Sequence, residues 1–336
     1  MKKLLLLVSI LLFSGCSSNN NTHSSSSIEE KKTPIDVILL AGQSNAAGYS
    51  AVLENETEEF DNVRYAGMTD KTMIGDQITI GSDFITSKDK YTSSITQGLG
   101  HADNYIGPEY GIAKELNDEY SDKHPLMVIK TASGGTTLSD VSSNLSGTFG
   151  NWHPKSLWKD GYTPDTDTPS KTKAATGLLY KLFIDNFRMV YNTLVEDNYE
   201  VNILGMVWMQ GESDADLGGT YISNYGNLLR TFINDVRSDI GEITNDDWLR
   251  NEMPFVIGKI ATTYYGYNRD VNIRIRQQQD NVANVMDNVE CVETEDLVII
   301  KANGQRNEGC VDDWHFNFND MVTLGKRFAN KVIELN

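Results

Sequence analysis

Cysteine and basic side chains are scarce in this chain. Three of its 336 residues are Cys, and 29 Lys and Arg stand against 47 Asp and Glu, which gives a formal net charge of -18. An acidic surface of this kind repels nucleic acid and anionic membranes. The cysteines and the five histidines also lack the spacing of a zinc site. We therefore expect no nucleic-acid partner, no metal and no other cofactor, and a neutral ligand fits the charge best.

The apolar run at the N-terminus is too short to span a bilayer. Residues 1–15 have a basic start, an apolar stretch and then small residues, which is the pattern of an export signal peptide. Cys16 follows directly and resembles the lipidated cysteine of bacterial lipoproteins. Residues 16–33 are polar, low in complexity and predict a flexible tether. We expect an exported lipoprotein in the outer membrane, the periplasm or at the cell surface, which touches a membrane only through its lipid anchor.

Residues 34–336 show no second linker and no internal repeat, so we expect one domain. Apolar stretches typical of buried strands cover Ile35–Leu40, Pro125–Lys130, Val201–Met209, Pro254–Ile260 and Leu297–Lys301. Helical periodicity runs between and after them, over 112–120, 179–194, 225–236, 275–286 and 321–335. The pattern predicts an α/β fold, a three-layer α/β/α sandwich with a mainly parallel five-stranded sheet in flavodoxin-like order.

The first predicted strand ends in the sequence Gly42-Gln43-Ser44-Asn45. In an open α/β sheet, ligands bind beyond the carboxyl ends of the strands, where helix N-termini supply amide donors. Ser44 is therefore well placed to be a nucleophile. On position alone, Ser44 is equally well explained as the N-cap of the following helix, because Ser is a favoured capping residue.

A histidine and a carboxylate precede the last predicted helix. A serine hydroxyl needs a neutral imidazole to take its proton and a carboxylate to orient that imidazole. Asp312 and His315, three residues apart, supply both groups. A single His is more often structural than catalytic, so the interpretation depends on His315 and Ser44 meeting in space.

Two further polar blocks follow predicted strands. One offers the amide of Gln210 as a donor to a developing oxyanion, and Glu212 as a support for the histidine or for its own loop. The other contains Gly134 and Gly135, where glycine lets a backbone N–H approach a substrate closely. A Gly-Gly pair alone is a weak signal, since it usually marks an ordinary turn.

Residues 50–108 and 133–174 contain few apolar runs and are expected to be long loops, which are usually either functional or disordered. Trp152 and Trp158, in the second of these loops, are candidates for stacking on a sugar ring. The alternative is that they anchor the loop on the body of the protein.

The two cysteines beyond Cys16 flank a late segment of the chain. In an exported protein, a disulfide between Cys291 and Cys310 would brace the loop that carries the Asp and His. The alternative is a pair of buried free thiols.

Four blocks taken together resemble a known superfamily. They are Gly42-Gln43-Ser44-Asn45, Ser133-Gly134-Gly135-Thr136, Trp208-Met209-Gln210-Gly211-Glu212-Ser213-Asp214 and Asp312-Asp313-Trp314-His315. Their order is similar to that of the SGNH hydrolases. More narrowly, they resemble the sialate O-acetylesterase-like group, which includes the acetylxylan esterases of carbohydrate esterase family six. The resemblance spans essentially the whole domain after the tether.

The resemblance implies a serine esterase that removes acetyl groups from acetylated xylan, other oligosaccharides or O-acetyl sialic acid. Ser44 matches the nucleophile and His315 the general base. Asp312 matches the triad carboxylate, but Glu212 matches a glutamate proposed for that role in some members, so both stay open. The remaining matching positions belong to the oxyanion and substrate-binding groups: the Ser44 amide, Gln43, Asn45, Gly134, Gly135 and Gln210. Asp313 departs from the family, where a small residue is usual.

Other interpretations of the same residues are a surface lipoprotein that binds carbohydrate without catalysis, and a lipase or thioesterase of the same fold. An α/β-hydrolase is disfavoured, because that fold carries Gly-x-Ser-x-Gly in mid-chain and its acid lies well before its histidine. Here the serine block opens the domain and lacks the second glycine.

Overall fold

The strand that leads to Ser44 forms the centre of the sheet. The computed structural model describes residues 31–336 apart from 57, 69–92, 142–149, 165–175 and 263–268, and its β1 runs over Thr33–Gly42. The residues of β1 from Val37 to Gly42 are all buried. They are buried because β1 is an inner strand, paired in parallel with β6 (Leu126–Ala132) on one side and with β7 (Tyr199–Met209) on the other.

The sheet has seven strands where the sequence predicted five. Their order is β4-β3-β6-β1-β7-β8-β9, with β3 at Phe60–Met68, β4 at Ser93–Ile95, β8 at Phe255–Gly258 and β9 at Val289–Val292. The strands β6-β1-β7-β8-β9 are mutually parallel. In chain order they read 2-1-3-4-5, which confirms the predicted flavodoxin-like arrangement. β3 extends the parallel part, and β4 pairs antiparallel with β3 at the edge.

Two strand predictions were wrong. β3 and β4 lie within 50–108, which was predicted as a loop. They were missed because polar residues such as Asp61 interrupt β3 and leave it without an apolar run. Conversely, Leu297–Lys301 is not a strand of the sheet, and Ile300 forms an isolated bridge with Arg306. The apolar residues of that stretch fill the core instead. The fifth parallel strand is the short β9.

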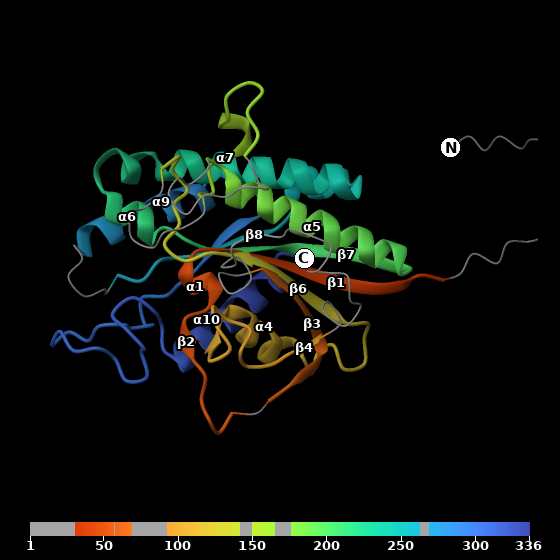
Figure 1. Ribbon diagram of the computed structural model, residues 1–336, viewed down its shortest axis with the longest axis horizontal. Coiled ribbons are helices and arrows are strands. Elements are labelled where there is room, and N and C mark those ends of the chain that lie inside the picture. Colours follow the sequence, from red (N-terminus) through yellow and green to blue (C-terminus); the bar gives the residue numbers. More distant parts are fainter. Residues whose placement is uncertain (1–30, 57, 69–92, 142–149, 165–175, 263–268) are drawn as a thin grey trace, which may run out of the picture. The chain divides into compact units, whose positions relative to one another are not determined.

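Helices cover both faces of the sheet, as Figure 1 shows. One face packs against α5 (Leu178–Glu196), α7 (Gly219–Thr244), α8 (Asp247–Glu252) and α9 (Arg269–Ala283), and the other against α4 (Pro108–Leu116) and α10 (Phe318–Glu334). Successive side chains of β1 alternate between these two cores: Val37 and Leu39 enter the first, Ile38 and Leu40 the second. The predicted three-layer sandwich is therefore confirmed.

Short elements surround the end of β1. They are α1 (Ser44–Ala47), α6 (Glu212–Leu217) and a ribbon of β2 (Ser50–Ala51) with β5 (Tyr105–Ile106). The 3₁₀ helix η1 (Lys155–Leu157) instead packs on α7, where Lys155 pairs with Asp239. Residues Lys32–Asn336 form one unit. The signal peptide, Cys16 and the tether up to residue 30 lie outside the described residues and stay predictions. Among the helices described, none is long and apolar enough to cross a membrane.

A buried ion pair joins β6 to α4. Lys130 Nζ lies 2.7 Å from Glu109 Oε2, and both side chains are completely buried. We expect Lys130→Met to lower the free energy of unfolding by about 3–5 kcal/mol, because it leaves the Glu109 carboxylate buried without its cation. Urea unfolding measures this. The control is Lys123→Met in the exposed pair with Glu119, which is expected to change the free energy of unfolding by less than about 1 kcal/mol. Equal effects of the two substitutions would contradict the prediction.

Candidate active site

Three parallel strands end at the same level, which brings the polar blocks together. In the register of the sheet, Gly42 at the end of β1 lies opposite Ala132 of β6 and Met209 of β7. The residues that follow β1, β6 and β7 therefore lie side by side beyond the carboxyl ends of these strands. Gly42 is needed there, because its φ is 142° and a Cβ would clash with the carbonyl oxygen of Met209.

The turn after β1 places Ser44 at the start of α1. Gln43 occupies the N-cap position, so Ser44 is the first helical residue and not the N-cap that position alone allowed. The side-chain oxygen of Gln43 accepts hydrogen bonds from the backbone N–H groups of Gly211 and Ser213, at 3.4 and 3.2 Å. Gln43 thus ties the serine turn to the loop after β7. Ser44 is nearly buried, with 9% of its surface exposed.

Asn45 and Glu212 connect the same two segments. Asn45 Nδ2 donates to Glu212 Oε1 at 2.9 Å. Glu212 is the first residue of α6, so its carboxylate also lies where the partial positive charge of a helix N-terminus favours it. Glu212 thus ties the start of α6 to the residue next to Ser44.

Asp312 and His315 form the hydrogen bond that their spacing predicted. His315 Nδ1 lies 2.7 Å from Asp312 Oδ2, and Asp312 Oδ1 accepts the backbone N–H groups of Trp314 and His315 at 2.8 and 3.0 Å. Burial alone would raise the pKa of Asp312. The hydrogen bond and charge of His315, together with the backbone N–H donors, outweigh the effect of burial, so the pKa of Asp312 is lowered. Since a carboxylate only accepts, Nδ1 carries the hydrogen, and Nε2 is left as the basic atom.

Asp313, the departure from the family pattern, has a structural role. It pairs with Arg306, whose Nε donates to Asp313 Oδ1 at 2.8 Å. Arg306 also donates from its NH1 to the carbonyl oxygen of Val311 at 3.0 Å. The acidic residue therefore braces the loop and leaves the Asp312–His315 pair undisturbed.

The loop that contains Asp312 and His315 contacts the segment that follows Ser44. Ser50 Oγ donates to the carbonyl oxygen of Phe316 at 2.7 Å. The ring of Tyr49 stacks on His315 with 4.5 Å between centroids, and its other face stacks on His101 at 4.1 Å. Two segments far apart in sequence thus lie against each other, and His315 is fixed beside the chain only a few residues beyond the serine. Tyr49 gave no signal in the sequence, because an aromatic residue after a helix is usually part of a core.

Gln210 does not serve the role predicted for it. Its Nε2 donates to the carbonyl oxygen of Thr136 at 3.0 Å and to Asp214 Oδ2 at 2.7 Å, so both amide hydrogens are used within the protein. The side chain is completely buried. Gln210 is thus not an oxyanion donor in this structure; it ties the end of β7 to the loop after β6. Gly134 and Gly135 belong to that loop, and Gly135 is partly exposed with a φ of 65°.

The buried carboxylate of Asp214 organises the continuation of the glycine loop. It accepts the backbone N–H groups of Leu138 and Ser139 at 2.8 and 3.2 Å, and the hydroxyl group of Ser139 at 2.7 Å. Burial raises the pKa of Asp214, although these hydrogen bonds and that from Gln210 act in the opposite direction. Sequence analysis gave Asp214 no role of its own, since only the tertiary structure shows what its carboxylate binds.

The two loop tryptophans are anchors, which was the alternative to sugar stacking. Trp152 is completely buried, meets Trp208 edge to face at 5.1 Å and donates from Nε1 to Thr136 Oγ1 at 3.0 Å. Trp158 is half-buried; it donates to the carbonyl oxygen of His153 at 3.0 Å and packs edge-on against Tyr180. The prediction that Trp152 stacks on a sugar was therefore wrong. The exposed indole beside the histidine is Trp314, 41% of which is accessible.

Cys291 and Cys310 are free thiols, so the predicted disulfide was wrong. Cys291 lies in β9 and packs against the core on the α5, α7 and α9 face. Cys310 is buried in the core on the α4 and α10 face. The sheet separates the two sulfur atoms. Burial raises the pKa of Cys291 to about 12 and that of Cys310 to about 11.

Within the part of the chain that the structure describes, no group of His, Cys, Asp and Glu side chains is arranged to hold a metal ion. The strand order is that of a flavodoxin-like α/β fold, and the polar blocks lie beyond the carboxyl ends of its strands, where such folds bind ligands. The chain belongs to the family of carbohydrate esterases described as sialic acid-specific acetylesterases, whose model matches residues 34–334. It is therefore a carboxylic ester hydrolase of the carbohydrate acetylesterase group.

Two solved structures are similar over nearly their whole length. A protein from Arabidopsis thaliana is 17% identical, with 90% of this chain and 98% of that chain covered and a TM-score of 0.55. NanS is 14% identical, with 91% and 98% covered and a TM-score of 0.57. At such low identity the likeness concerns the fold alone. A comparison with curated proteins gives no significant match.

Proposed function

We propose that this protein removes O-acetyl groups from carbohydrate by acyl transfer through Ser44, with His315 as general base and Asp312 as the carboxylate that orients it. The observation that carries the proposal is the 2.7 Å contact between His315 Nδ1 and Asp312 Oδ2, on a loop that packs against the residues following Ser44. Because Nδ1 contacts Asp312, Nε2 is the nitrogen placed to take the proton of a serine nucleophile.

The reaction has two acyl-transfer steps. His315 Nε2 takes the Ser44 hydroxyl proton while Oγ attacks the acetyl carbonyl carbon, and the tetrahedral intermediate collapses to an acetyl-enzyme as the sugar alcohol leaves with that proton. Water then loses a proton to His315 and attacks the acetyl-enzyme, and the intermediate collapses to acetate as His315 returns that proton to Ser44 Oγ. The backbone N–H of Ser44, at the start of α1, and an N–H of Gly134 or Gly135 are the proposed oxyanion donors.

We assign the triad acid to Asp312 and a positioning role to Glu212. The Nδ1 atom of His315 has Asp312 as its partner, whereas Glu212 accepts from Asn45. Glu212 therefore holds the turn that contains Ser44 and acts on the nucleophile through its neighbour.

The proposed substrates are acetylated xylan, shorter acetylated oligosaccharides and O-acetyl sialic acid. We also keep the proposal that the protein is exported and tethered through a lipid on Cys16. Acetate release from p-nitrophenyl acetate, acetylated xylo-oligosaccharides, O-acetyl sialic acid and p-nitrophenyl esters of longer acids tests the activity. We expect turnover of acetyl esters and a steep loss with acyl length. Absence of acetate release from every acetylated compound would refute the proposal, and a preference for long acyl chains would indicate a lipase or thioesterase.

Tyr49 is expected to position the catalytic imidazole. Replacing Tyr49 by Leu removes the stacked ring from His315, and we expect kcat to fall about three- to tenfold with little change in KM, on the scale of one aromatic contact. Tyr49→Phe keeps the ring and should keep most of the activity. Steady-state kinetics on an acetyl ester measure both. Equal activity of the Leu and Phe variants would show that stacking does not matter.

A further inference from the structure

We propose that a pocket between α7 and the continuation of the glycine loop binds a neutral sugar unit of the acetylated substrate. The inference rests on the proposed function and names the class of carbohydrate. The pocket has a volume of about 460 Å³, which lies within the range of small-ligand sites. Its lining residues are Ser139, Asp140, His153, Leu157, Thr220, Tyr221, Ser223, Asn224 and Leu228.

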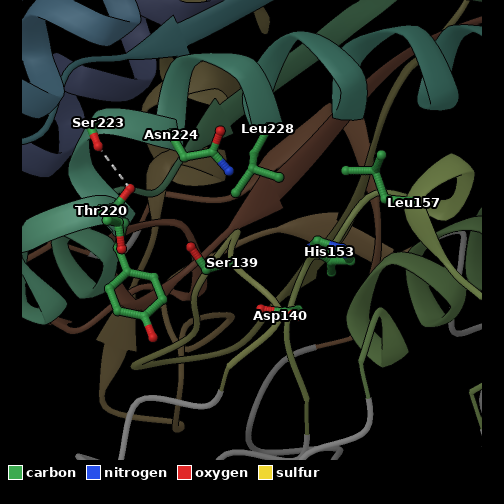
Figure 2. A pocket seen from close by; sticks show the side chains of 9 residues that line it. Ser139, Asp140, His153, Leu157, Thr220, Ser223, Asn224 and Leu228 are labelled. Carbon is green, nitrogen blue, oxygen red and sulfur yellow. Dashed lines mark hydrogen bonds between the residues drawn. The ribbon is translucent and has the colours of Figure 1, made fainter.

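The lining has the chemistry of a sugar site. Figure 2 shows the pocket between Asn224 and Leu228 of α7 and the loop residues Ser139, Asp140 and His153. Hydroxyl, amide and carboxylate groups suit the many hydroxyl groups of a sugar, each of which both donates and accepts. The ring of Tyr221 and the two leucines offer apolar surface to the C–H groups of a pyranose.

The charge of the lining favours a neutral sugar over an anionic one. None of the described residues that line the pocket is Lys or Arg, and Asp140 is acidic. Burial lowers the pKa of His153. The charges of Asp140 and Asp235 and a backbone hydrogen bond act in the opposite direction but are weaker, so the imidazole is neutral at neutral pH. A carboxylate such as that of sialic acid would meet no cation here and would be repelled by Asp140.

The pocket and the nucleophile are fixed to the same short helix. The Asp214 carboxylate holds the backbone and hydroxyl group of Ser139, which lines the pocket. Two residues earlier in α6, Glu212 holds Asn45, the neighbour of Ser44. Two hydrogen-bonded contacts through α6 thus link the pocket wall to the turn that contains Ser44, and we assign the pocket to a sugar unit of the same substrate.

Binding to a Ser44→Ala protein tests the pocket without turnover. Calorimetric titration would use three neutral probes, xylotriose, mannotriose and maltotriose, and N-acetylneuraminic acid as the anionic one. We expect at least one neutral probe to bind, and N-acetylneuraminic acid to bind at least about tenfold more weakly, because its carboxylate would be buried without a partner. Binding of the anionic probe alone, or of no neutral probe, would overturn the inference.

Substitutions in the Ser44→Ala background locate the sugar. Asp140→Ala and Asn224→Ala should each raise the Kd of the neutral probe at least about tenfold, since each removes polar contacts to the ligand. The control is Asn234→Ala, an exposed asparagine on the same helix outside the pocket, which should leave the Kd unchanged. If Asp140→Ala and Asn224→Ala bind like the control, the sugar lies elsewhere and the inference is wrong.

The proposed function is tested separately. Acetate release from p-nitrophenyl acetate by the unsubstituted protein needs no sugar. If no acetate is released, the esterase proposal is refuted and the binding results still stand. If acetate is released but Asp140→Ala and Asn224→Ala bind sugar like the control, only the proposed sugar pocket is refuted.

Discussion

Ser44→Ala is expected to lower kcat for acetate release by about 10⁴-fold or more, the scale of losing a triad nucleophile. The substitution removes the atom that forms the acetyl-enzyme and leaves the main chain of α1 in place, so the oxyanion donors and substrate contacts remain. Acetyl-enzyme formation, followed by mass spectrometry after rapid mixing with p-nitrophenyl acetate, should disappear together with turnover.

The matched control is Ser121→Ala, an exposed serine whose hydroxyl donates to the carbonyl oxygen of Asp118 far from the strand ends. It should keep the activity of the unsubstituted protein. The thermal unfolding midpoint of Ser44→Ala should stay close to that of the unsubstituted protein, because Ser44 is not the N-cap of α1. Turnover at the parent rate by a folded Ser44→Ala protein would rule out the serine mechanism.

The second large effect distinguishes the two candidate acids. Asp312→Asn is expected to lower kcat by about 10⁴-fold, because an amide accepts poorly and can present its NH₂ group to His315, which selects the wrong tautomer. Glu212→Gln should cost far less, about tenfold, since a glutamine oxygen still accepts the hydrogen bond from Asn45. Steady-state kinetics of both variants on one acetyl ester give the comparison.

The pH dependence provides an independent readout of the same assignment. Hydrogen bonds from His315 and the backbone lower the pKa of Asp312 despite its burial, so this carboxylate stays ionised when the pH falls below the usual range of Asp. Acidification into the ordinary titration range of Asp should therefore leave the Asp312–His315 hydrogen bond in place, so the activity lost there should not come from Asp312. A larger loss in Glu212→Gln than in Asp312→Asn would exchange the two roles.

Structural features that depend on local sequence were predicted well. The spacing of Asp312 and His315 brings both side chains to one turn, which three intervening peptide units suffice to form. The buried run of β1 and the glycine at its end fixed the strand and the position of Ser44. The helices α5, α7 and α10 were marked by long, regular apolar periodicity.

Other features depend on contacts between distant segments and could not be predicted from local sequence patterns. Gln210 carries the right chemical group for an oxyanion donor, but Thr136 and Asp214 occupy its amide hydrogens. Trp152 lies in a polar segment that suggests exposure, yet it fills the core against Trp208. β3 was missed because its polar residues hide a strand whose place is set by pairing with β6.

The sequence alone determined the layer architecture, the family and the local contact between Asp312 and His315, because apolar periodicity and short motifs encode helices, strands and local turns. The tertiary structure decided which carboxylate contacts the histidine, which polar groups form hydrogen bonds inside the protein and which aromatic rings are accessible. Those outcomes depend on hydrogen bonds and packing between residues as far apart as Ser50 and Phe316, and a side chain's partners are set by the folded neighbours around it.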